Sequence, residues 1–291
     1  MNLLSRMRGG MALVILLAAS SSMARAEEAS KAEPSPCRNP TVASVPSRPT
    51  VANATDLTQC GVVEVEYGYD HQWLGAGVHH NDLTGGLRLG LTPNLDLHWS
   101  SASFLNFVDG AGNRSSFGDT WLGLKYRFLV QKKRRPSLGV FYAAKVPTAN
   151  FSKGMGSGQV DHSFSFLASK DIRRVHFDFN VIGLLIGRTG ASGVDHNLGF
   201  ALSAYYPLTH RLNLVVEPYG YTLLNESTPA FASTMGGFTY QVCPRIYLDA
   251  GFDAGVTHGA PNNRVFVGAT YAIANVYSWM YMRQPASFYR P

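Results

Sequence analysis

After its first 26 residues, the sequence has no long apolar run. A transmembrane helix needs about 20 consecutive apolar residues, so none is expected in the rest of the chain. Charged residues are also scarce, at 15%. The whole chain has a net charge of +6. Without residues 1–26, the chain has 22 basic and 19 acidic residues and a net charge of +3. Nucleic acid is therefore not an expected partner.

Cysteine is rare, and the usual catalytic and metal motifs are missing. The three cysteines are Cys37, Cys60 and Cys243, and an odd count leaves one unpaired in an exported chain. Cys37 and Cys60 are expected to pair in an oxidising compartment and to hold the segment between them near the first strand. No CxxC, HExxH, GxSxG or phosphate-binding glycine motif is present. We therefore expect no cofactor and no metal.

The amino terminus has the pattern of an export signal. Arg6 and Arg8 precede an apolar stretch at 11–19, and Ala-Arg-Ala at 24–26 resembles a cleavage site. Residues 27–60 are rich in Pro, Ser, Ala and Thr and show no periodicity. This composition predicts a flexible periplasmic segment, with a plug or a partner-docking arm as the alternative.

From residue 61 onward, apolar and polar residues alternate. The clearest stretch is GLRLGLTPNLDLHW at 86–99, where a Pro-Asn turn separates two alternating runs. Such a pattern predicts a β-hairpin with a Leu and Trp face and a charged face. In a soluble sandwich the apolar face would pack on a second sheet, whereas in a membrane barrel it would contact lipid.

The spacing of the connections favours the barrel. About twelve strands fall within 61–275, followed by a C-terminal extension at 276–291. Short turns alternate with generally longer Gly, Asn and Ser-rich links, as in outer-membrane barrels with short periplasmic turns and longer external loops. The links expected outside the cell are His71–Asn81, Asp109–Ser116, Ala149–Val160, Thr189–His196, Asn225–Ala230 and Thr257–Asn263. The sequence therefore predicts an all-β, closed, antiparallel transmembrane barrel in the bacterial outer membrane, with lipid around it.

Ionisable residues gather on the predicted inner face. Some of the bases come early in the chain and some of the acids late, so a basic wall and an acidic wall could face each other across a narrow water-filled path. The alternative is a network of ion pairs that fills the barrel. The predicted lumen-lining residues are Glu64, Glu66, Arg88, Asp96, His98, Lys125, Arg127, Lys145, His176, Asp178, Glu217, Asp249 and Asp253.

One short motif carries a catalytic alternative. His98 and Ser100 share a strand face with Asp96, and a His-x-Ser pair can supply the base and the nucleophile of a lipid-cleaving barrel. Such a pair would face lipid, whereas the alternation turns His98 inward. We therefore expect a polar pair in the lumen and no catalytic residue.

The chain resembles the family of exported barrel proteins that is named for the meta-cleavage pathway of phenol degradation. The resemblance runs from about Gly61 to Ile273 and includes LRLGLTPNLDL at 87–97, GDTWLGLKYRF at 118–128, YPLTHRLNL at 206–214 and IYLDAGFDAGV at 246–256. It implies transport of small, often aromatic or hydrophobic compounds and brings no catalytic residues. We thus expect a channel or uptake porin for a small-molecule solute. The competing classes are a lipid-acting enzyme and a structural barrel with a sealed lumen, and the pattern carries no indication of oligomeric state.

Overall fold

The structure is a computed structural model that describes residue 37 and residues 41–224, 229–261 and 263–278. The predicted signal at 1–26 and most of the extension at 276–291 lie outside the described residues. Within the described part, no helix is both long enough and apolar enough to cross a membrane.

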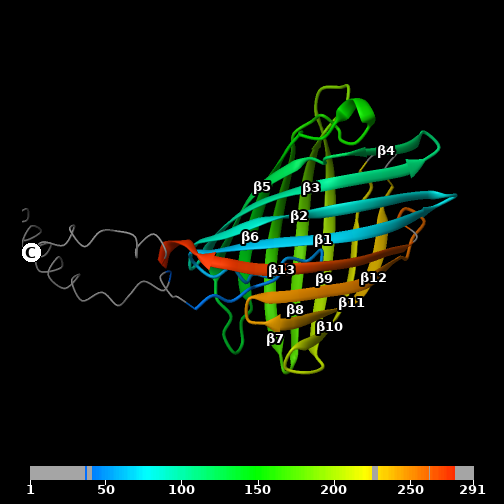
Figure 1. The fold of residues 1–291 in the computed structure, drawn as a ribbon. Coiled ribbons are helices and arrows are strands. Elements are labelled where there is room, and N and C mark those ends of the chain that lie inside the picture. Colours follow the sequence, from blue (N-terminus) through cyan, green and yellow to red (C-terminus); the bar gives the residue numbers. More distant parts are fainter. Residues whose placement is uncertain (1–36, 38–40, 225–228, 262, 279–291) are drawn as a thin grey trace, which may run out of the picture. The chain divides into compact units, whose positions relative to one another are not determined.

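The described residues form one antiparallel sheet that closes on itself (Figure 1). β1 pairs with β13 on one side and with β2 on the other, and β2 pairs with β3 to complete the ring. The strands are β1 (Val62–Gly75), β2 (Val78–Thr92), β3 (Leu95–Asp109), β4 (Gly112–Ser116), β5 (Thr120–Leu129), β6 (Ser137–Val146), β7 (Asp161–Ile172), β8 (Val175–Gly187), β9 (Val194–Pro207), β10 (Leu212–Tyr221), β11 (Phe231–Cys243), β12 (Ile246–Gly255) and β13 (Asn263–Asn275).

Twelve of these strands make up the closed ring, and β4 is an addition to it. β3 pairs with β5 along Leu95–Ser101 and with β4 along Leu105–Asp109. β4 therefore continues the edge that β5 leaves free. The predicted closed antiparallel barrel of about twelve strands is confirmed.

The two faces of the wall differ as the alternation predicts. The outward side chains of Leu87, Leu122, Leu124 and Tyr126 are 42–47% exposed, whereas Lys125 between two of them is 1% exposed. A closed ring satisfies every backbone hydrogen bond within the wall, which a bilayer requires because it holds no water. An apolar outer belt on such a ring places the barrel in the outer membrane.

The short turns, the start of β1 and the end of β13 lie at one end of the barrel. Val62 pairs with Asn275 there. In outer-membrane barrels the short turns lie on the periplasmic side, so we call this end the periplasmic end. At the other end, two predicted loops are wrong. The residues of 71–81 belong to β1 and β2 apart from the turn at 76–77, and 112–116 form β4. These strands extend toward the external end. Both faces of the wall meet water there, so apolar and polar side chains need not alternate.

Candidate functional site

The lumen contains a segment of the chain itself, residues 41–59, here called the inner segment. Its backbone amides donate to wall side chains on opposite sides of the ring. Val45 N donates to Glu64 Oε1 on β1 at 2.6 Å, and Asn53 N donates to Asn180 Oδ1 on β8 at 2.7 Å. β1 and β8 lie half the ring apart, so the inner segment spans the lumen.

Carboxylates hold the first half of the inner segment. Glu66 accepts from Arg48 N at 2.6 Å, and both oxygens of Glu217 accept from the consecutive amides of Val51 and Ala52 at 2.7 and 2.6 Å. Glu217 is fully buried. Buried backbone amides need partners, and here the wall supplies charged ones.

The second half is held by donors and acceptors alike. Asn180 Nδ2 returns a hydrogen bond to Asn53 O at 2.9 Å, and Thr55 N donates to Ser169 Oγ at 2.8 Å. Lys125 Nζ donates to the carbonyl of Asp56 at 2.7 Å, and Thr58 N donates to Asp96 Oδ2 at 2.8 Å. Residues 41–59 therefore differ from the flexible periplasmic segment expected there, because twelve strands leave an interior that the wall's own side chains do not fill.

A disulfide joins Cys37 to Cys60, with 4.5 Å between the Cα atoms. It brackets the inner segment at the start of β1, as the pairing hypothesis expects. Cys243, the last residue of β11, is a free cysteine. The inner segment is thus tethered covalently at both of its ends.

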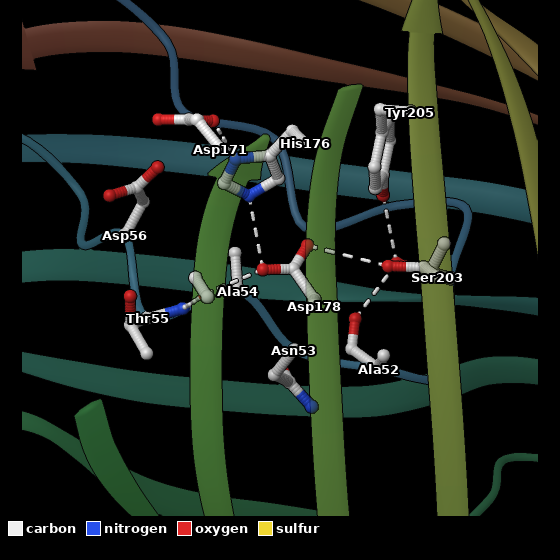
Figure 2. Close-up of polar contacts among 12 residues, drawn as sticks. Ala52, Asn53, Ala54, Thr55, Asp56, Asp171, His176, Asp178, Ser203 and Tyr205 are labelled. Atoms are coloured by element: carbon white, nitrogen blue, oxygen red, sulfur yellow. Dashed lines mark hydrogen bonds and ion pairs between the residues drawn. The ribbon is translucent and has the colours of Figure 1, made fainter. Parts of the chain in front are cut away.

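Near the periplasmic end, His176 bridges two carboxylates (Figure 2). Its Nδ1 lies 2.6 Å from Asp171 Oδ1 and its Nε2 lies 3.1 Å from Asp178 Oδ1. Ser169 Oγ donates to the same Asp178 oxygen at 2.6 Å while it accepts from Thr55 N. A continuous polar chain therefore connects the barrel rim to the backbone of the inner segment.

The predicted basic and acidic walls do not face each other across water. Arg88 pairs with Glu64 at 2.7 Å and with Glu66 at 2.9 Å, all within one side of the wall. Across the lumen, Asp249 pairs with Arg48 of the inner segment at 3.2 Å. The predicted opposition of a basic wall and an acidic wall is wrong, because the inner segment and local ion pairs take up those charges.

Three more of the predicted residues form ion pairs. Arg127 pairs with Asp56 of the inner segment at 3.3 Å, and Asp253 pairs with Arg264 at 3.1 Å. Lys145 contacts Asp161 at 2.5 Å and Asp119 at 3.3 Å. Sequence reasoning singled out neither of these two aspartates.

External residues 147–160 fold toward Lys145. Its ammonium donates to Ser157 Oγ at 2.8 Å, and Met155 in the same loop is only 4% exposed. The loop contains the short helix η3 (Phe151–Lys153), and Lys153 Nζ donates to Ser115 O on β4 at 3.2 Å. These contacts hold the loop against the external end of the barrel.

A cavity of about 600 Å³ remains between the inner segment and the wall. Apolar and aromatic side chains line it from β5, β6, β8 and β10, namely Trp121, Phe141, Leu184, Ile186 and Tyr221. Polar side chains line it from β2, β3, β7 and the inner segment, namely Arg88, His98, Ser100, Asp161, Arg48 and Asn53. We call this cavity the chamber.

His98 and Ser100 both line the chamber, but they do not form a catalytic pair. His98 Nε2 has no hydrogen-bond partner; Asp96 Oδ2 lies 3.7 Å away, and the imidazole packs 4.9 Å from the ring of Phe141. A serine nucleophile needs a base within hydrogen-bond reach. Among the residues described, no group of three or more His, Cys, Asp or Glu side chains is placed to hold a metal ion.

Comparison with known proteins gives one family match. The model of the family described as "Putative MetA-pathway of phenol degradation" matches residues 47–273. The chain belongs to this family. The match includes part of the inner segment as well as nearly the whole barrel, and the resemblance noted from the sequence is confirmed. No curated protein matches the chain significantly.

Solved structures support the fold of this phenol-degradation family member. An outer membrane channel from Pseudomonas putida F1 aligns with a TM-score of 0.60 at 13% identity, over 77% of this chain and 99% of that one. The NanC porin aligns with a TM-score of 0.50 at 12% identity, over 72% of this chain and 100% of that one. At such low identity the likeness establishes the barrel fold alone.

Proposed function

We propose that the chain is an outer-membrane channel whose resting state is closed by the inner segment, and that it passes small solutes with an aromatic ring and a polar group. The chamber is the observation that carries this proposal. Its volume of about 600 Å³ is within the range of small-molecule pockets, which are mostly apolar with a few polar groups that fix orientation.

The lining of the chamber is divided in a way that suits such a solute. Trp121 and Phe141 offer aromatic surface from neighbouring strands, while Arg88 and His98 present nitrogen atoms from β2 and β3. An aromatic ring can stack on the first pair, while a hydroxyl or carboxylate group faces the second. The description of the family by phenol degradation and the similarity to the Pseudomonas outer membrane channel agree with this function.

Release of the inner segment would not open the wall. Its backbone bonds go mainly to wall side chains. Ser44 N donates to the carbonyl of Pro244 in the β11–β12 turn, and Cys60, which follows the segment, bridges to Gly90 on β2. The sheet ladder is therefore complete without residues 41–59. Movement of this segment would connect the chamber with the periplasm while the barrel stays intact.

A sealed structural barrel is the competing function, because its lumen would also be filled. Liposome swelling can distinguish the channel from the sealed barrel. The test compares benzoate, which has an aromatic ring, with glucose, a small solute that has none. We expect faster swelling with benzoate, and Trp121→Ala to reduce the benzoate rate more than the glucose rate. Leu122→Ala, whose side chain is 47% exposed on the lipid face, is the matched control. If liposomes with the protein swell no faster than protein-free liposomes in either solute, the result would instead support the sealed barrel.

A further inference from the structure

The periplasmic end of the barrel carries an unusual concentration of positive charge. Four of the turns at this end cover residues 130–136, 173–174, 208–211 and 244–245, and none of them contains Asp or Glu. The exposed bases in these turns, here called the basic arc, are Lys132, Lys133, Arg134, Arg135, Arg173, Arg174, Arg211 and Arg245.

The basic arc covers a continuous part of the rim. Its turns join β5 to β6, β7 to β8, β9 to β10 and β11 to β12, so they follow eight neighbouring strands of the twelve-stranded ring. The remaining turn, Pro93-Asn94 between β2 and β3, has no charge. The charge is therefore confined to one side of the periplasmic rim.

These charges are not neutralised by the protein. No ion pair described in residues 41–224, 229–261 and 263–278 includes any of the eight. Asp171, the acid next to the β7–β8 turn, already binds His176 and Gln131. Lys170 adds a further positive charge and donates to the carbonyls of Lys132 and Lys133. The arc therefore presents unpaired cationic groups to its surroundings.

The arc borders the apolar belt of the barrel. Val130 and Leu208 begin two of these turns and Ile172 directly precedes a third, and all three side chains are 46–55% exposed. The guanidinium carbon of Arg174 lies 5.7 Å from the ring centroid of Tyr206, which is 41% exposed on the outer face. Aromatic residues on the outer face near strand ends mark the membrane interface, so the arc lies at the level of the lipid headgroups.

We propose that the basic arc binds anionic phospholipid headgroups of the periplasmic leaflet. Lipid phosphates occupy this level of the bilayer, and long basic side chains reach them while their stems cover apolar surface. The adjacent apolar side chains favour lipid over an acidic protein, which would have to cover Val130, Ile172 and Leu208 as well. The interaction is independent of passage through the lumen.

Native mass spectrometry of the full chain in detergent can test this binding, with phosphatidylglycerol and phosphatidylcholine added separately. Each basic residue near an anionic surface contributes about fivefold in affinity. We expect wild-type protein to prefer phosphatidylglycerol, and joint replacement of Lys132, Lys133, Arg134 and Arg135 by Gln to weaken that binding at least about tenfold. Phosphatidylcholine binding should stay unchanged.

The matched control is Lys153→Gln with Arg188→Gln, which removes exposed charge from the external side. It should retain the preference for phosphatidylglycerol, and circular dichroism should find both variants folded. Equal affinity of wild-type protein for the two lipids would overturn the proposal. So would an unchanged preference in the four-Gln variant. If that variant instead loses crosslinks to an acidic periplasmic protein in cells and keeps its lipid preference, the arc binds protein and the lipid assignment is wrong.

Discussion

Replacement of Glu217 by Gln should release the inner segment more often. Glu217 accepts two backbone amides, Val51 N and Ala52 N, at 2.7 and 2.6 Å. A hydrogen bond to a charged group contributes about 1.5–3 kcal/mol. Gln keeps one acceptor oxygen but turns an NH₂ group toward the second amide, so at least one bond is lost.

The expected cost to the docked state is therefore about 2–3 kcal/mol. Because 1.4 kcal/mol is a tenfold change in an equilibrium constant, the undocked population should rise roughly 25- to 150-fold. In planar-bilayer recordings this change appears as a higher open probability. The conductance of each open event should stay the same, because the wall itself is unchanged.

Asp253→Asn is the matched control. Asp253 also lies on the inner face and is 4% exposed, but it binds Arg264 and Tyr219 and not the inner segment. Its replacement should leave the open probability close to that of the wild type. The explanation for Glu217 is wrong if Glu217→Gln opens no more often than the wild type, or if both variants open equally often.

Three other changes test separate parts of the structure. Leu124→Arg places a charge on the lipid face and should lower stability by about 2–4 kcal/mol in urea unfolding if it lies near the bilayer midplane, whereas a neutral effect would argue against lipid at this position. Cys60→Ser removes a link with a sequence separation of 23 and should cost about 3 kcal/mol and increase brief openings, whereas Cys243→Ser should do neither. If Cys60→Ser matched Cys243→Ser in both assays, the tether would have no role. Purified wild-type protein should hydrolyse no phospholipid, and Ser100→Ala should leave solute flux unchanged; hydrolysis that Ser100→Ala abolishes would restore the enzyme hypothesis.

The wall of the barrel could be predicted because each strand has its own local signal. In 122–128, Leu, Leu, Tyr and Phe alternate with Gly, Lys and Arg, and the structure places these two sets on opposite faces. The alternation is required only where one face meets lipid. It fades in β4 and in the outer parts of β1 and β2, and for that reason the sequence predicts loops there.

The inner segment could not be predicted in the same way. Its amides bind side chains far along the chain, such as Glu217, which is 165 residues from Ala52, and no short window of sequence contains such a pattern. Two weaker signals exist. Cys37 and Cys60 bracket the segment, and the predicted inner face holds more carboxylates than Lys and Arg together. The surplus carboxylates need donors, which the backbone of residues 41–59 provides.

We propose that residues 41–59 close an otherwise complete barrel. The most direct test is the single-channel conductance of a chain that lacks residues 41–58 and keeps Cys37 and Cys60, compared with the full chain in the same bilayer. We expect the shortened chain to fold and to show a stable conductance well above the resting level of the full chain. A folded, shortened barrel with the same conductance as the full chain would contradict the claim.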